Sequence, residues 1–138
     1  MFAALKCNRD RALIAFYIST GARASELLGV EQGLVAPEDQ TIGVVRKGSQ
    51  VLQHLPASAD AFVWLRLYQQ ELRGMVPKRV SEPLWWTLRR PIRPLEYDAA
   101  RMVFTRASTA MVFAVTVGQA GRWSGHGWGP CCCQGVGR

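Results

Sequence analysis

An arginine stands where a short helix is expected to begin, in a position suited to binding an anionic group. Arg23 follows Gly21 in the segment 20–30, T-G-A-R-A-S-E-L-L-G-V. Gly21 can supply backbone angles that other residues resist, and residues 22–28 are mostly strong helix formers. We therefore expect Arg23 in the first turn of a short helix. The backbone would then hold this cation in place, which makes Arg23 the leading candidate functional residue.

Two further cations are expected together on a hairpin. Residues 41–45, T-I-G-V-V, and 50–55, Q-V-L-Q-H-L, are typical of two short strands, and Gly48 lies in the turn between them. This hairpin would carry Arg46 and Lys47 at or near its tip. A lysine beside a turn glycine is usually a solvated charge, so the local sequence alone assigns Lys47 no role.

The net charge of +7 is unevenly distributed along the chain. Acidic and basic residues cancel over residues 1–72. Residues 73–106 have only three acidic residues, Glu82, Glu96 and Asp98, against eight basic ones: Arg73, Lys78, Arg79, Arg89, Arg90, Arg93, Arg101 and Arg106. A basic segment beside a neutral one is typical of a surface that binds a polyanion, although a solvated surface would look the same.

Length and composition indicate one globular domain without a membrane segment. The chain has 138 residues and 49% apolar residues. Its longest apolar runs, residues 12–18 and 111–117, are far shorter than the roughly 20 residues that span a bilayer. The N-terminal M-F-A-A-L-K lacks the features of a secretory signal. We therefore expect a cytoplasmic protein without a membrane partner.

Three longer helices are expected to build the core. The first begins near Asn8, with Asp10 in its first turn and the apolar residues 12–18 buried all round. The second follows Ser58 as its cap and has one apolar stripe: Phe62, Leu65, Tyr68, Leu72 and Met75. The third has Tyr97, Ala100 and Phe104 on one side, with Arg101 outside that set. Packing therefore explains all three tyrosines, Tyr17, Tyr68 and Tyr97.

Irregular segments separate these helices. Residues 35–40 have the composition of a loop, and residues 84–87, L-W-W-T, are expected to be extended. Trp85 and Trp86 would then point to opposite faces, with one packed and the other partly exposed. His54 is expected to be half-buried in its strand. The segment 88–94, L-R-R-P-I-R-P, is a basic linker that carries Arg89, Arg90 and Arg93.

The last thirty residues differ in composition from the rest of the chain. Residues 109–138 contain no Asp, Glu or Lys, but hold three of the four Cys and seven of the thirteen Gly. A zinc site built from His126, Cys131, Cys132 and Cys133 fits poorly, because zinc ligands are usually spaced two to four residues apart. We favour a shifted reading frame and expect a tail without a stable fold of its own, and no metal.

The Arg23 segment, the hairpin V-V-R-K-G-S and the L-P-A-S that follows together resemble the first half of the catalytic domain of tyrosine recombinases, the phage integrase family. Residues 83–101, P-L-W-W-T-L-R-R-P-I-R-P-L-E-Y-D-A-A-R, resemble the segment that leads actinobacterial-type members to their second conserved box. The resemblance covers residues 8–108 approximately. It implies an α+β fold, mostly helical, with a small antiparallel sheet that includes a hairpin near residues 41–55.

The resemblance implies DNA as the partner, no metal, no cofactor and no small-molecule substrate. In the family a tyrosine attacks the scissile phosphate and two arginines hold its oxygens, a role for which the planar, permanently charged guanidinium is well suited. Arg23 matches the first of these arginines. Lys47 matches the hairpin lysine that acts as general acid on the leaving 5′ oxygen. Glu26 matches the acidic residue of the arginine box and is expected to orient Arg23 or to cap local structure.

The second half of the family's pattern is missing. Neither His54 nor His126 begins an H-x-x-R box, and no tyrosine follows Tyr97. We therefore expect residues 1–108 to form a partial, truncated recombinase domain and residues 109–138 an atypical tail. The expected function of this chain is DNA binding without cleavage, with DNA contacts from Arg46, Arg89, Arg90, Arg93 and Arg101. It could act with other recombinase subunits, one of which could supply a tyrosine. The alternatives are a basic nucleic-acid-binding module unrelated to catalysis and a zinc-stabilised protein.

Overall fold

The computed structural model describes the backbone of residues 5–120 and the side chains of residues 5–109. The tail was expected over residues 109–138; its part from residue 121 onward, with His126 and the cysteine cluster, lies outside the described residues. The elements in chain order are α1 (Asn8–Thr20), α2 (Ala24–Leu28), η2 (Gln32–Leu34), β1 (Val35–Ala36), β2 (Thr41–Val45), β3 (Leu52–Pro56), α3 (Ala59–Glu71) and α4 (Tyr97–Ala120). This confirms the predicted α+β class.

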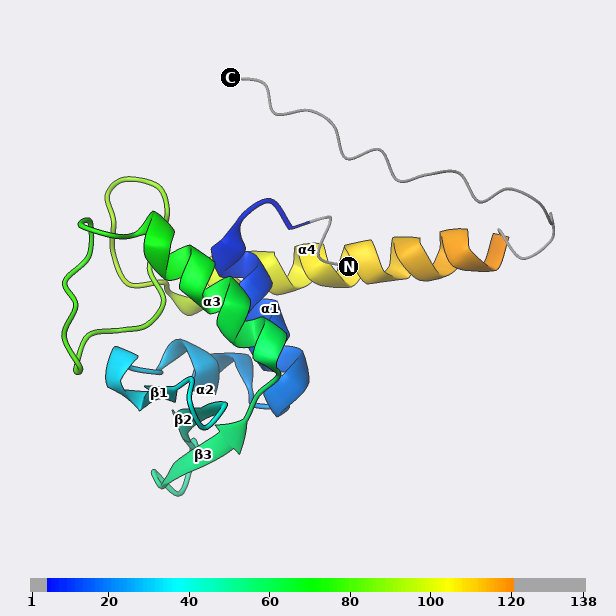
Figure 1. Ribbon diagram of the computed structural model, residues 1–138. Coiled ribbons are helices and arrows are strands. Elements are labelled where there is room, and N and C mark those ends of the chain that lie inside the picture. Colours follow the sequence, from blue (N-terminus) through cyan, green and yellow to red (C-terminus); the bar gives the residue numbers. More distant parts are fainter. Residues whose placement is uncertain (1–4, 121–138) are drawn as a thin grey trace.

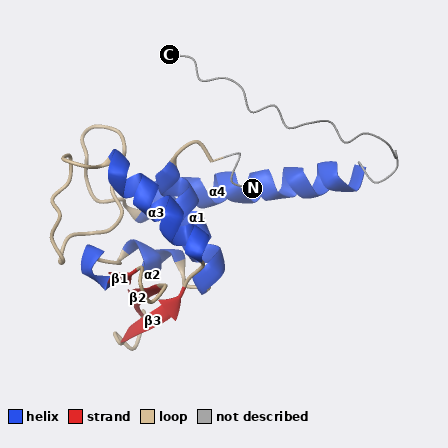
Figure 2. Ribbon diagram, viewed as in Figure 1, coloured by secondary structure: helices blue, strands red, loops and turns tan. Residues whose placement is uncertain are grey.

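The longer helices and the sheet form two parts of the fold (Figure 1). In that view α1, α3 and α4 lie together in the upper part, and α2 with the three strands lies below them. Figure 2 shows how little of the chain is strand. The core therefore lies mainly between helices, and the sheet extends from one side of it.

Helix α1 provides the centre of the core, as its sequence predicts, but over a shorter stretch. Residues 12–16 are buried, whereas Tyr17 is 42% exposed and Ile18 is 53% exposed. The prediction that the apolar run is buried all round is therefore wrong at its end, where the Tyr17 ring makes an edge contact with Phe104 but stays partly exposed. The helix is capped by Cys7 rather than Asn8 and ends at Gly21, whose φ of 65° suits glycine.

The sheet has three antiparallel strands in the order β1-β2-β3. The predicted hairpin is confirmed, and its register places Gly43 opposite His54 and Val45 opposite Leu52. Strand β1 was expected to be loop. It pairs with the start of β2 over only two residues, Val35 and Ala36, and so depends on this partner rather than on a local pattern. His54 is exposed rather than half-buried.

Helix α3 follows the predicted stripe up to its C-terminal end. The Ser58 hydroxyl caps it by accepting a hydrogen bond from the backbone N–H of Ala61. Leu65, Tyr68 and Leu72 are buried, but Met75 is 51% exposed. The stripe stops there because the helix ends at Glu71 and the chain turns away at Gly74, where φ is 83°.

Trp85 and Trp86 are both buried, at 1% and 8% exposure, which corrects the prediction that one remains exposed. The segment is not a regular strand, so the two indoles do not alternate between a covered and an open face. The Trp85 indole N–H donates to the Leu27 carbonyl at 2.8 Å, and that of Trp86 donates to the Pro83 carbonyl at 2.7 Å.

Helix α4 packs through Ala100, Val103 and Ala107, with Phe104 partly covered. Tyr97, expected on the packed side, is 56% exposed. The helix continues through Ala120, so its end does not coincide with the change in composition after Ser108. No helix within residues 5–120 is both long and apolar enough to cross a bilayer.

Candidate functional site

Arg23 caps α2 instead of lying in its first turn. Its backbone is extended, with φ −69° and ψ 148°, and its carbonyl accepts the first hydrogen bond of the helix from Leu27 at 3.0 Å. Its N–H donates to the Glu26 carboxylate at 3.0 Å. The side chain is exposed, and among the described residues no carboxylate lies close enough to form a salt bridge with it. The backbone of Arg23 is thus fixed while its guanidinium remains accessible.

Glu26 links this turn to the hairpin. Its side chain is only 3% exposed, and its Oε2 lies 3.3 Å from a guanidinium nitrogen of Arg46. The pKa of Glu26 is lowered, mainly by the hydrogen bond from the Arg23 backbone, against the opposing effect of burial. The charge of Arg46 and the backbone N–H of Lys47 lower it further. One carboxylate therefore interacts with the backbone at both Arg23 and Lys47.

The hairpin turn leaves the Lys47 side chain exposed beside this contact. The Arg46 N–H bonds to the Val51 carbonyl at 3.1 Å, and the Gln50 N–H bonds to the Arg46 carbonyl at 3.0 Å. Gly48 closes the turn with a φ of 115°. Arg46 also donates to the Gln53 side chain at 2.9 Å. Arg46 is therefore held in place, whereas Lys47 forms no ion pair with any described residue.

A second group of cations lies on the loop between Trp86 and Pro94. Arg89, Arg90 and Arg93 are all exposed. Thr87 holds the base of the loop, since its N–H bonds to the Arg93 carbonyl at 2.8 Å and its hydroxyl accepts from the Arg93 N–H at 3.0 Å. No ion pair or hydrogen bond among the described residues joins these arginines, or the exposed Arg101, to the Glu26 group. Of the predicted DNA contacts, only Arg46 therefore bonds to the Glu26 carboxylate.

The tyrosines of the described part differ in accessibility. Tyr68 is fully buried, as predicted; its hydroxyl accepts from the Trp86 N–H at 2.7 Å and donates to the Leu84 carbonyl at 3.3 Å. Burial raises its pKa well above the ordinary value. Tyr97 is exposed, so packing does not account for it as the sequence suggested, whereas the exposed Tyr17 still packs in part on Phe104. Among the side chains described, those of residues 5–109, no three His, Cys, Asp or Glu are grouped as metal ligands.

Sequence reasoning missed two features of the site. The first is the contact between Glu26 and Arg46, since Arg46 was assigned to DNA alone and no local pattern pairs residues twenty positions apart. The second is a cavity lined in part by Lys78 and Arg79. In the sequence, these two residues stand out only as members of the basic segment 73–106.

Replacing Glu26 with Gln tests the link that this carboxylate makes. We expect the free energy of unfolding at pH 7 to fall by about 1–3 kcal/mol, because hydrogen bonds to a buried charge weaken. Because the pKa of Glu26 is lower in the folded state than its ordinary value of 4.5, the ionised carboxylate stabilises the fold at pH values above 4.5. This stabilisation is lost as the pH falls from 4.5 through the lower, folded-state pKa. Urea titrations from pH 7 to pH 3 should therefore show a flatter pH dependence for E26Q. The exposed Glu38→Gln serves as control; an unchanged profile in E26Q would contradict the assignment.

Comparison with known proteins gives a sequence likeness and a structural likeness. The chain is 38% identical over 69 residues to the tyrosine recombinase XerD of Chlorobaculum tepidum, which covers 49% of this chain and 22% of that protein. The structure is similar to the crystal structure of XerA recombinase, with a TM-score of 0.55 and 16% identity, over 88% of this chain and 40% of that one. No protein-family model matches the sequence.

The two likenesses carry different weight. The XerA likeness is one of fold, because the sequence identity is only 16%. The XerD likeness is one of sequence, over about a fifth of that protein's length. Together they support a relation of this chain to the tyrosine recombinase family.

Proposed function

We propose that the chain is a DNA-binding fragment of a site-specific tyrosine recombinase of the phage integrase kind, actinobacterial in type. Residues 1–108 form the recombinase part and residues 109–138 an atypical C-terminal segment. The observation that carries this proposal is the Glu26 carboxylate, which joins the Arg23 turn to the Arg46–Lys47 turn. Arg23 and Lys47 are exposed cations whose backbones are both held by Glu26. This arrangement suits a phosphate, because preorganised donors need no rearrangement when charge develops.

Each residue has a definite part in this proposal. Arg23 holds the non-bridging oxygens of a backbone phosphate with its planar fork. Lys47 lies at the 5′ oxygen, where in a complete enzyme its ammonium would give a proton to the leaving group. Glu26 is a positioning residue. Residues 1–138 contain no H-x-x-R and no tyrosine after Tyr97, so binding without strand cleavage is the activity proposed for them.

Salt-dependent binding to a fluorescent DNA duplex tests the first part of the proposal. Arg23→Ala and Lys47→Ala should each weaken binding and reduce the slope of log K against log salt by about 0.9, the effect of losing one phosphate contact. Arg66→Ala and Lys6→Ala remove exposed cations elsewhere on the fold and serve as matched controls. Equal effects for all four variants would contradict a specific role for Arg23 and Lys47.

A nicked duplex that traps covalent complexes tests the second part. We expect no protein-linked DNA band on a denaturing gel. A band that disappears when Tyr17 or Tyr97, the two exposed tyrosines of the described part, is replaced with Phe would overturn the proposal that this chain binds DNA without cleaving it.

A basic nucleic-acid-binding module without any recombinase role is the second candidate. It is favoured by one observation, the separate group of exposed arginines on the 86–94 loop. If binding depends on Arg89, Arg90 and Arg93 and is unaffected in Arg23→Ala and Lys47→Ala, this second candidate is the better one.

A further inference from the structure

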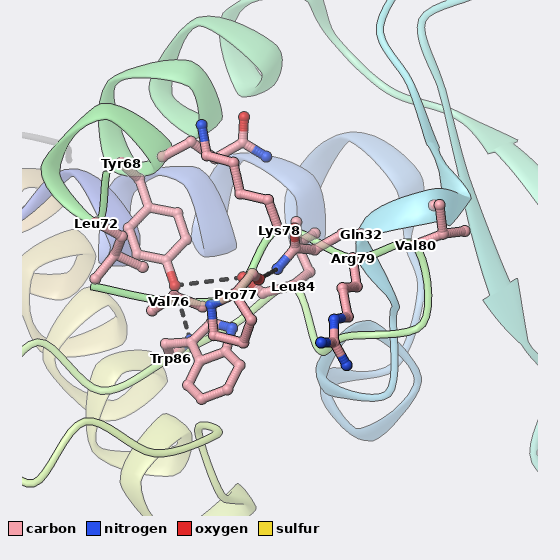
Figure 3. Close-up of a pocket in the computed structure, with 12 residues that line it drawn as sticks. Gln32, Tyr68, Leu72, Val76, Pro77, Lys78, Arg79, Val80, Leu84 and Trp86 are labelled. Atoms are coloured by element: carbon pink, nitrogen blue, oxygen red, sulfur yellow. Dashed lines mark hydrogen bonds between the residues drawn. The ribbon is translucent and has the colours of Figure 1, made fainter. Parts of the chain in front are cut away.

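A cavity of about 310 Å³ opens between the C-terminal half of α3 and the segment 76–86. Its lining includes Tyr68, Leu72 and Trp86, which are mostly apolar, together with Gln32, Lys78 and Arg79; in Figure 3 the Lys78 side chain runs toward α3 and Arg79 points away from it. The two cations, Lys78 and Arg79, are exposed and form no ion pair with a described residue. No Asp or Glu is among the lining residues. The cavity therefore suits a group that is apolar in its body and surrounded by negative charge.

Backbone contacts hold the walls of the cavity in place. The Gln32 N–H bonds to the Glu82 carbonyl at 2.8 Å, and the Gly33 N–H bonds to the Val80 carbonyl at 2.9 Å. The Gln32 amide also donates to the carbonyls of Pro77 and Pro83, at 3.2 and 3.3 Å. A Cβ on Gly33 would lie only 2.1 Å from a methyl group of Val80 and 3.0 Å from its carbonyl oxygen, so a larger residue there would require Val80 to move. The cavity is thus preformed.

A complementary group lies at the start of α4 on the same chain. Tyr97 is 56% exposed, and its neighbours Glu96 and Asp98 are exposed as well. None of the three forms an ion pair with a described residue, and none lines the cavity of its own chain. A tyrosine ring has an apolar body with a polar end, which suits a pocket that is apolar inside and wet at its mouth.

We propose that residues 96–98 of a second copy of this chain dock into the cavity, with the Tyr97 ring against Trp86 and with Glu96 and Asp98 beside Lys78 and Arg79. Two copies that exchange this contact in both directions form a closed dimer. The C-terminal residues 109–138 are not the occupant, because they contain no Asp or Glu to match the cations. The contact uses neither Arg23 nor Lys47, so it holds whether or not the chain binds DNA.

Sedimentation velocity of the full chain over a range of concentrations tests the proposal. We expect a concentration-dependent dimer whose dissociation constant rises at least tenfold in Tyr97→Ala and in the double variant K78E/R79E. Val63→Ala removes another exposed apolar side chain, one that does not line the cavity, and should leave the dissociation constant unchanged. Circular dichroism of each variant checks that the helices are retained.

Reversing the charges of the cavity residues Lys78 and Arg79, or of Glu96 and Asp98, provides the decisive comparison. K78E/R79E and E96K/D98K should each be monomeric, because like charges then face one another, and should form a heterodimer when mixed. A peptide of residues 94–103 should dissociate the unmodified dimer, whereas a scrambled peptide should not. This experiment needs no variant, so it remains informative if a substituted chain fails to fold. A monomer at all concentrations, or a dimer that none of these changes affects, would overturn the proposal. Weaker DNA binding in K78E/R79E with unchanged association would show a phosphate-binding surface instead.

Discussion

Replacing Trp85 with Ala is expected to lower the free energy of unfolding by about 3–5 kcal/mol, the cost of truncating a large buried aromatic side chain. Trp85 is 1% exposed. Its ring stacks on Tyr68 of α3 with centroids 5.8 Å apart and contacts the edge of Phe16 of α1 at 6.2 Å. Its indole N–H bonds to the end of α2 at Leu27. One side chain thus joins the three helices that precede it.

Urea denaturation followed by circular dichroism measures this effect. Small domains are stable by only about 5–15 kcal/mol, so W85A should be partly unfolded without denaturant or should unfold at a much lower urea concentration. Trp85→Phe is the matched control, because it keeps an aromatic ring in the core and loses the indole N–H; it should cost less. A W85A midpoint equal to that of the unmodified chain would contradict the central position of Trp85.

Elements set by local chemistry could be predicted from the sequence. Ser58 caps α3, Gly21 ends α1 in a left-handed conformation, and Gly48 turns the hairpin, each because a backbone requirement falls on a residue that meets it. The helical spacing of Leu65, Tyr68 and Leu72 likewise identified the buried side of α3. Arg23 was placed within one residue of its observed position at the start of α2.

Features that depend on contacts between distant segments could not be predicted. Strand β1 exists through its pairing with β2, and Trp86 is buried because the 84–95 segment folds irregularly over the core. Tyr17 and Tyr97 looked like core residues by spacing, yet both are exposed, although the Tyr17 ring packs in part on Phe104. For the site, residue types identified Arg23 and Lys47 as candidates. Only the folded hairpin brings Arg46 and the Lys47 backbone to the carboxylate of Glu26.

The exposed loop arginines should account for a large share of the DNA affinity proposed for this chain. Replacing Arg89, Arg90 and Arg93 together with Ala removes up to three phosphate contacts. The slope of log K against log salt should then fall by about 2.7, at about 0.9 for each contact. The loop itself should persist, because Thr87 holds it through the backbone of Arg93 rather than through an arginine side chain.

Titration of labelled duplexes at several salt concentrations measures this slope, and two unrelated duplex sequences separate charge from sequence recognition. Phosphate contacts carry no sequence information, so the triple variant should lose affinity to the same extent on both duplexes. Arg66→Ala with Arg73→Ala is the control, since both residues are exposed cations that lie outside the 86–94 loop. An unchanged slope in the triple variant would mean that DNA, if bound, contacts only the Arg23 and Lys47 side of the molecule. A loss confined to one duplex would mean that the loop reads bases rather than phosphates.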